Sequence, residues 1–133
     1  MKVYKSDEIK NVALVGGAKS GKTTLAEAML FEGKVIDRRG SVDDRNSVSD
    51  YHEIETAKQN SVYSTLMYTE YDGKKINIID TPGFSDYVGE VVSALSVVET
   101  AIMVVNSTVG VDATTENAWR QTEKTGTPVL FVI

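Results

Sequence analysis

Eight consecutive residues, 16–23, have the types and the spacing of a loop that binds phosphate. The run Gly16-Gly17-Ala18-Lys19-Ser20-Gly21-Lys22-Thr23 fits the pattern G-x-x-x-x-G-K-[ST]. Its glycines allow the backbone N–H groups to turn inward around an anion, and a following helix would present its positive N-terminus to the same anion. Lys22 would place a charge near the β- and γ-phosphates, and the Thr23 hydroxyl could bind Mg²⁺. The predicted nucleotide-binding residues are Gly16, Gly17, Ala18, Lys19, Ser20, Gly21, Lys22, Thr23 and Thr24.

A second cluster, Asp80-Thr81-Pro82-Gly83, follows an apolar stretch in the middle of the chain. An Asp at the tip of a buried strand beside a phosphate loop is placed to hold Mg²⁺, usually through water. Gly83 could bring its backbone N–H against a γ-phosphate, because a side chain there would crowd the approach. A Pro-Gly turn with a capping Asp is the alternative interpretation. In the context of the phosphate loop, the nucleotide site is predicted to include Asp80, Thr81, Pro82 and Gly83.

The residues around these motifs alternate between strand and helix patterns. Short apolar or β-branched runs predict strands, and apolar residues at helical spacing predict helices. The expected strands are 11–15, 65–71, 75–80, 100–105 and 129–133, and the expected helices are 23–31, 85–98 and 114–125. Asp72-Gly73 predicts a tight hairpin turn between the second and third strands. This order predicts an α/β fold with a doubly wound, mostly parallel sheet and helices on both of its faces.

Two further stretches bear on how the chain is organised. Residues from 34 to about 61 are rich in charge and poor in apolar side chains, which predicts a long functional loop. The last run, Val129-Leu130-Phe131-Val132-Ile133, is strongly apolar, and no helix that could cover it follows. Uncovered apolar edge strands favour aggregation. We therefore expect a fold that is incomplete at the C-terminus, as in the N-terminal part of a longer protein.

The composition excludes several classes of protein. The chain has 133 residues, a net charge of −5, no Cys and one His. The absence of Cys excludes disulfide scaffolds and thiol nucleophiles, and a single His excludes a multi-His metal centre. The negative charge argues against direct DNA binding. No apolar run approaches the roughly 18 residues of a membrane span, and the N-terminus has no signal-peptide pattern, so we expect a cytoplasmic protein.

The chain resembles the nucleotide-binding domain of translational GTPases, and within them elongation factor G. Besides the phosphate loop and residues 80–83, the similarity includes Asp86-Tyr87-Val88-Gly89-Glu90-Val91, Ala118-Trp119-Arg120-Gln121 and Gly126-Thr127-Pro128. The stretch 86–91 and the stretch from 118–121 to 126–128 carry little general nucleotide chemistry, so they indicate this family in particular. Tetracycline-protection proteins and a class of peptide release factor look similar over the same region.

The resemblance implies a small-GTPase-like phosphate-loop fold, in which residues 1–133 form the N-terminal part of a GTP-binding domain with a switch loop at about 34–61. It implies GTP or GDP and Mg²⁺ as cofactors, GTP hydrolysis as the activity, and the ribosome as partner of the full-length protein, with no membrane. The switch Thr that closes on Mg²⁺ in the family corresponds to Ser61, which keeps the hydroxyl. The expected metal ligands are Thr23, Ser61 and Asp80.

Phe84 and Lys19 depart from the family pattern. The family has a His directly after Asp-Thr-Pro-Gly that orients the attacking water, and the Phe84 ring has neither donor nor lone pair. Loss of such a group lowers the rate by about 10²–10⁴. We therefore expect slow GTP hydrolysis, in which Lys22 and Gly83 contribute to catalysis and Phe84 does not. Many members carry Asp where this chain has Lys19, which either stabilises the leaving oxygen or is solvated.

Two alternatives to a hydrolysing elongation factor G-like translocase stay open on the sequence. The first is a GTP-dependent switch that binds the ribosome without hydrolysis, or a ribosome-protection protein. The second is a phosphate-loop ATPase or kinase. The family's guanine-recognition element, Asn/Thr-Lys-x-Asp, would begin immediately beyond Ile133, so guanine specificity depends on the resemblance.

Overall fold

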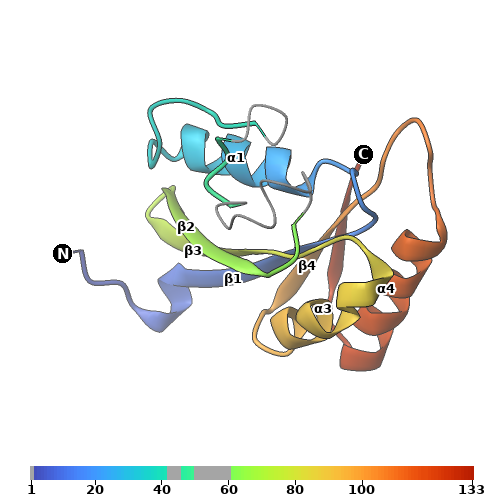
Figure 1. The fold of residues 1–133 in the computed structure, drawn as a ribbon. Coiled ribbons are helices and arrows are strands. Elements are labelled where there is room, and N and C mark those ends of the chain that lie inside the picture. The colour runs from blue at the N-terminus through green and yellow to red at the C-terminus, as the bar shows by residue number, and fades with distance from the viewer. Residues whose placement is uncertain (1, 42–45, 50–60) are drawn as a thin grey trace.

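A computed structural model describes residues 2–41, 46–49 and 61–133 of the chain. The expected switch loop therefore lies partly outside the described residues, at 42–45 and 50–60. The strands are β1 (Ile9–Val15), β2 (Thr65–Tyr71), β3 (Lys74–Asp80), β4 (Thr100–Val104) and β5 (Val129–Val132), and the helices are α1 (Lys22–Glu32), α3 (Val88–Leu95) and α4 (Ala113–Thr125) (Figure 1). Each predicted strand and helix is present, and the ends differ little except for the helix predicted at 85–98.

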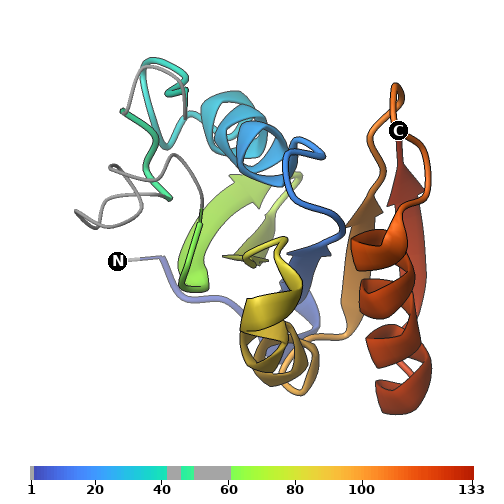
Figure 2. The same cartoon turned by 45° about the vertical axis from the view of Figure 1, so that its right-hand side comes forward.

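The described strands form a sheet in the order β2-β3-β1-β4-β5. β1 pairs in parallel with β3 and with β4, and β4 pairs in parallel with β5. β2 and β3 are antiparallel because the predicted turn, Asp72-Gly73, joins them with positive φ at both residues. α1 covers one face of the sheet, whereas α3 and α4 cover the other (Figure 2). The predicted mostly parallel sheet with helices on both faces is therefore confirmed.

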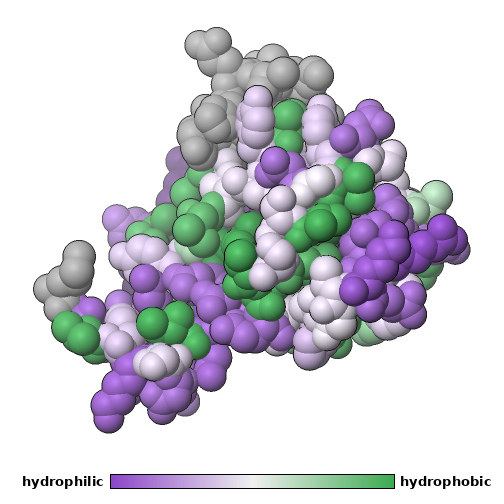
Figure 3. All heavy atoms as spheres, turned by 90° about the horizontal axis from the view of Figure 1, so that it is seen from below, coloured by the Kyte–Doolittle hydropathy of each residue, from purple (hydrophilic) through white to green (hydrophobic). Residues whose placement is uncertain are grey.

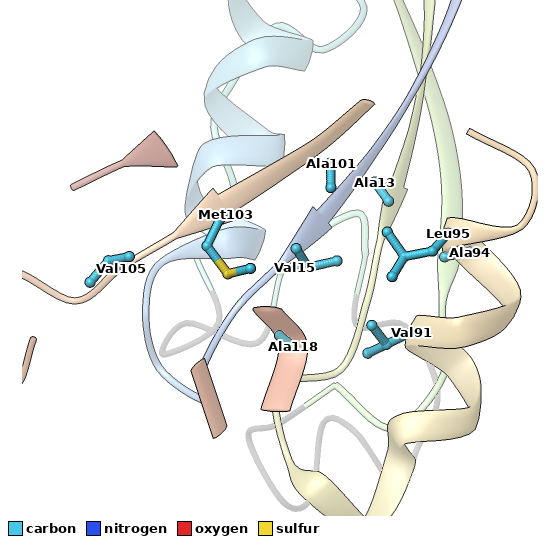
Figure 4. Packing of buried hydrophobic residues seen from close by; sticks show 9 residues of the cluster. All are labelled: Ala13, Val15, Val91, Ala94, Leu95, Ala101, Met103, Val105 and Ala118. Carbon is cyan, nitrogen blue, oxygen red and sulfur yellow. The ribbon is translucent and has the colours of Figure 1, made fainter. Parts of the chain in front are cut away.

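Two apolar clusters lie between the sheet and its helices. Successive side chains of a strand point to opposite faces, so neighbouring residues of β1 and β4 belong to different clusters. The cluster beneath α3 and α4 contains Ala13, Val15, Val91, Ala94, Leu95, Ala101, Met103, Val105 and Ala118 (Figure 4). The cluster beneath α1 contains Leu14, Ala26, Leu30, Met67, Ile78, Ile102 and Val104. Burial on both faces explains why the ends of β1 and β4 are continuously apolar.

The helix predicted for residues 85–98 is shorter than expected. A single 3-10 turn precedes it, and the α-helical part, α3, ends before Ser96. The Ser96 hydroxyl donates to the Ser93 carbonyl oxygen at 2.7 Å, which competes with continuation of the helix. The N–H of Glu99 then donates to the Asn11 carbonyl oxygen at 3.2 Å, so the chain already joins the sheet at that point.

Apolar side chains are exposed on β5. Leu130 and Phe131 are 57% and 54% exposed, and the Phe131 ring stacks on the Trp119 ring of α4 with 5.7 Å between centroids. Apolar residues also gather in the middle of the face seen from below (Figure 3). Among the described residues, none of the helices has both the length and the apolar character that crossing a bilayer requires.

Candidate nucleotide-binding site

The phosphate loop lies where the strand order of the sheet reverses. β1 runs between β3 and β4, so the loop that follows it leaves the carboxyl edge of the sheet at this switch point. Gly21 precedes α1 with φ 100°, and Gly16 has φ 133°. A Cβ on Gly16 would lie 2.3 Å from the Val104 carbonyl oxygen of β4. Both positions therefore require glycine by backbone angle, and Gly16 also by lack of space.

Lys22 crosses the inside of this loop. Its ammonium group donates to the carbonyl oxygens of Gly17 at 2.7 Å and Gly16 at 3.1 Å, and the side chain is buried. The Ser20 Oγ atom is also buried, and no hydrogen bond to it occurs within the part of the chain that the structure describes. A phosphate oxygen would accept from such a hydroxyl and attract both the ammonium group and the N-terminus of α1. The loop therefore fits a phosphate group.

Thr23 and Asp80 meet beside the loop although 57 positions separate them in the sequence. The Thr23 hydroxyl donates to Asp80 Oδ2 at 2.7 Å, and both side chains are buried. Mg²⁺ takes oxygen ligands and is commonly held by one or two carboxylates together with phosphate oxygens and water. Three or more His, Cys, Asp or Glu residues do not gather anywhere among residues 2–41, 46–49 and 61–133. The hydroxyl and the carboxylate therefore suit a nucleotide-bound magnesium ion.

Gly83 lies directly against the phosphate loop. A Cβ there would lie 2.6 Å from both the Ala18 backbone nitrogen and Lys22 Nζ, so the site has room for glycine alone. Thr81 contacts β1 instead of the loop. Its N–H and its hydroxyl both donate to the Leu14 carbonyl oxygen, at 3.3 and 2.7 Å. Thr81 thus fixes the end of β3 to β1, and the chain beyond it, through the buried Pro82, reaches the loop.

Phe84 lies next to this contact, and its side chain is 39% exposed. It lines a small pocket beside the phosphate loop together with Gly16, Gly83, Val88, Thr114 and Ala118. A hydrocarbon ring therefore stands beside the glycine that faces Lys22. The ring can pack against apolar neighbours, but it cannot bind water through a hydrogen bond.

The structure does not test the predicted nucleotide and metal contacts of the Lys19, Thr24 and Ser61 side chains. Lys19 and Thr24 are exposed, and Lys19 has a left-handed backbone with φ 58°. Ser61 is partly buried ahead of β2. Their predicted contacts with the nucleotide and the metal stay predictions.

The N-terminus of α4 packs on the other side of the phosphate loop. A Cβ on Gly17 would lie 2.8 Å from Thr114 Oγ1 and 3.0 Å from Asp112 Oδ1. Asp112 accepts from the hydroxyl and the N–H of Thr115, each at 2.7 Å. These bonds, chiefly that from the Thr115 side chain, hold the pKa of Asp112 below its ordinary value. An ionised carboxylate therefore caps α4 directly behind the loop.

Comparison with known proteins agrees with this geometry. The family described as "Elongation factor Tu GTP binding domain" matches residues 7–133. The chain belongs to this family. The resemblance to translational GTPases is thereby confirmed, and a GTP-binding domain is favoured over a phosphate-loop ATPase or kinase.

The relatives of this GTP-binding domain are considerably longer proteins. An "Elongation factor G-like protein" of Mycobacterium tuberculosis is 41% identical over 125 residues, which are 94% of this chain and 18% of the relative. The mitochondrial "Ribosome-releasing factor 2" of Debaryomyces hansenii is 34% identical over 96% of this chain and 15% of its own length. A crystal structure of a Thermus thermophilus protein has 36% identity and a TM-score of 0.89 over 93% of this chain and 19% of that chain. The chain spans less than a fifth of each.

The sequence did not indicate two residues that connect the predicted switch loop to the site and to α1. The Ser49 hydroxyl donates to Asp80 Oδ2 at 2.7 Å. Glu27 of α1 accepts from the backbone N–H groups of Gly40 and Val48. No signal marked Ser49, which is one hydroxyl among many in a polar loop. Glu27 did have a signal, because it lies one helical turn after Thr23 and on the same face.

Asn106 is a third residue that the sequence did not indicate. Its Nδ2 donates to the Lys19 carbonyl oxygen at 3.1 Å, and its Oδ1 accepts from the N–H of Thr108 at 2.9 Å. The side chain therefore joins the phosphate loop to the turn after β4. Its position just after a buried strand at the carboxyl edge of the sheet was the available signal.

Proposed function

We propose that this chain binds GTP with Mg²⁺ as the nucleotide-binding domain of an elongation factor G-like protein. The observation that carries the proposal is that Lys22, Thr23 and Asp80 converge beside one phosphate loop, with Gly83 against its backbone. Membership of the GTP-binding family supports guanine as the base. The residues 1–133 would form the N-terminal part of that domain.

Each residue of the site has a role in this proposal. The N–H groups of the loop and the N-terminus of α1 would hold the phosphates, and Lys22 would exchange the loop carbonyls for phosphate oxygens. Magnesium, when bound, supplies positive charge that neutralises charge developing on the phosphates. Thr23 would bind the ion through its hydroxyl, Asp80 would accept from the water around it, and Ser61 would complete the set. Gly83 would offer its N–H to the γ-phosphate.

Hydrolysis in this proposal is slow. Phe84 occupies the position at which the family pattern has the water-orienting His, and its ring offers no hydrogen bond to the attacking water. Lys22 and Gly83 would still stabilise the charge on the phosphates. A switch that acts by binding GTP alone is the second candidate, and the same feature, Phe84, favours it.

The ribosome is the proposed partner of the full-length protein. Relatives carry the names elongation factor G-like protein, ribosome-releasing factor 2 and peptide chain release factor 3. These names support a role in translation. We expect that role in the cytoplasm, without contact to membrane or DNA. Translocation, ribosome release and ribosome protection would share this nucleotide domain.

Nucleotide affinity tests the proposal. The full-length protein should bind fluorescent GDP more tightly than fluorescent ADP and should retain it only with Mg²⁺. Lys22→Ala should weaken binding by about 10- to 100-fold, the range of one hydrogen bond to a charged group. Lys124→Ala, a change at an exposed position of α4, is the matched control and should bind normally. Equal affinity for the adenine and guanine nucleotides would refute the proposal.

A further inference from the structure

Glu27 is a buried acid with an unusual pair of partners. It is 1% exposed and lies on α1, one turn after the predicted metal ligand Thr23. Its Oε2 accepts from the N–H of Gly40 at 2.9 Å, and its Oε1 accepts from the N–H of Val48 at 2.5 Å. One carboxylate therefore fixes two points of the predicted switch loop that are eight positions apart in the sequence.

Ser49 follows directly and lies inside the site. It is 1% exposed, and its carbonyl oxygen accepts from the Thr65 hydroxyl of β2 at 3.0 Å. Its own hydroxyl donates to Asp80 Oδ2 at 2.7 Å. The same oxygen accepts from Thr23 Oγ1 at 2.7 Å.

These two bonds use the hydrogen-bonding capacity of Asp80 Oδ2. A carboxylate oxygen has two lone pairs, and here the hydroxyls of Thr23 and Ser49 occupy both directions. A magnesium ion held by Thr23 would bring water molecules that also need to donate to this carboxylate. The other oxygen, Oδ1, is buried and accepts no hydrogen bond within the described part of the chain. Ser49 therefore occupies the Asp80 oxygen that Thr23 contacts, and water on an ion held by Thr23 would compete with Ser49 for that oxygen first.

We propose that Ser49 is a competitor of the magnesium hydration shell at Asp80 and that Glu27 is the positioning residue that holds Ser49 there. Binding of the ion would then require the Ser49 hydroxyl to leave Asp80. The switch loop would thus report occupancy of the metal site through the bond between Ser49 and Asp80. This role depends on the proposed binding of GTP with Mg²⁺.

The Mg²⁺ concentration at which half of the fluorescent GDP is retained tests the competition in the full-length protein. Ser49→Ala should lower this concentration about threefold to tenfold, the range of one net hydrogen bond. Ser49→Cys, which has nearly the same shape but a weak S–H donor, should fall between the alanine variant and the wild type. Ser93→Ala, on the exposed face of α3, is the matched control.

Trypsin cleavage after the exposed Arg38 and Arg39 tests the positioning role without measuring activity. Glu27→Gln leaves a single acceptor oxygen for two N–H groups, so cleavage should become faster and the Mg²⁺ requirement should fall as in Ser49→Ala. Glu32→Gln, at an exposed position of the same helix, should change neither quantity.

Three outcomes would overturn the inference. If Ser49→Ala leaves the Mg²⁺ requirement unchanged or raises it, Ser49 does not compete with the ion. If Glu27→Gln changes neither cleavage nor the Mg²⁺ requirement while it folds normally, Glu27 does not position Ser49. If wild-type protein binds guanine nucleotide without any Mg²⁺ dependence, the proposed function itself fails, and that result is visible before any variant is made.

Discussion

At the scale of single residues, the site depends on which atoms can form hydrogen bonds. Asp80 offers an oxygen to hydroxyls, Lys22 offers an ammonium group to loop carbonyls, and Gly83 leaves room for the loop backbone and for Lys22. Phe84, next along the chain, offers only hydrocarbon. In the proposed function its neighbours would hold the nucleotide, whereas this side chain offers no hydrogen bond to an attacking water molecule.

Replacing Phe84 tests whether this side chain is the reason for slow hydrolysis. Phe84→His should raise single-turnover γ-phosphate release by about 10²–10⁴, because an imidazole can orient the attacking water. The measurement is made on the full-length protein with and without ribosomes. Phe31→His is the matched control, since Phe31 and Phe84 are each 39% exposed and Phe31 lies near the end of α1. If the wild type already hydrolyses GTP quickly and the variant is no faster, another group positions the water, and Lys19 is the next residue to change.

At the scale of elements, the capped N-terminus of α4 packs against the phosphate loop. Asp112 precedes the helix with extended backbone and accepts from the Thr115 N–H at 2.7 Å. Side chains of this type at the N-cap position satisfy N–H groups that the helix leaves without partners. Because Asp112 and Thr114 lie behind Gly17, the capped end of α4 also supports the phosphate loop.

The cap predicts a pH-dependent contribution to the stability of α4. Asp112→Ala should lower the free energy of local opening by about 1–2 kcal/mol near neutral pH. The pKa of Asp112 is lowered in the folded state, chiefly by the Thr115 hydroxyl, so its contribution is full above the ordinary value of 3.8 and is lost as pH falls through the folded value. Hydrogen exchange of α4 amides, corrected for intrinsic rates, measures the difference. The difference in opening free energy between wild type and Asp112→Ala should become smaller in acid. The exposed control Glu123→Ala should differ little from wild type at any pH.

At the scale of the whole molecule, the sheet is a layer buried on both faces. α1 packs on one cluster and α3 and α4 pack on the other, so both layers bear on β1, the strand that carries the phosphate loop. Position 14 belongs to the α1 layer and is fully buried, and its carbonyl oxygen accepts from Thr81. The core and the site are thus supported by the same strand.

Shortening the Leu14 side chain tests how much the apolar layer beneath α1 contributes to stability. Leu14→Ala should lower the free energy of unfolding by about 2–5 kcal/mol, because it removes buried methyl groups and leaves a cavity. Leu66→Ala is the control with the same chemistry, since Leu66 is 71% exposed on β2 and should change the value by less than about 0.5 kcal/mol. Urea denaturation followed by far-ultraviolet circular dichroism compares the two. Equal effects would show that burial between sheet and helix does not decide stability here.

The order of strands and helices was predictable because each follows from a local pattern. Apolar runs marked the buried strands, and Asp72-Gly73 marked the hairpin. The helix predicted to reach residue 98 was too long. Val98 continues its apolar pattern, but the Ser96 hydroxyl and the hydrogen bond from the Glu99 N–H to Asn11 end the helix earlier. The sequence did not reveal this end, because part of it depends on a strand far away in the chain.

By itself the sequence determined the phosphate loop, its glycines and the acid that follows β3, because each is a short pattern whose chemistry is contained in neighbouring residues. Only the tertiary structure decided that Ser49 reaches Asp80 across 31 positions and that Glu27 holds Val48 across 21. Hydroxyls and backbone N–H groups are common in any polar loop, so their types carry little information about partners. The fold selects among them, because it brings one hydroxyl to the buried carboxylate and excludes water from the contact.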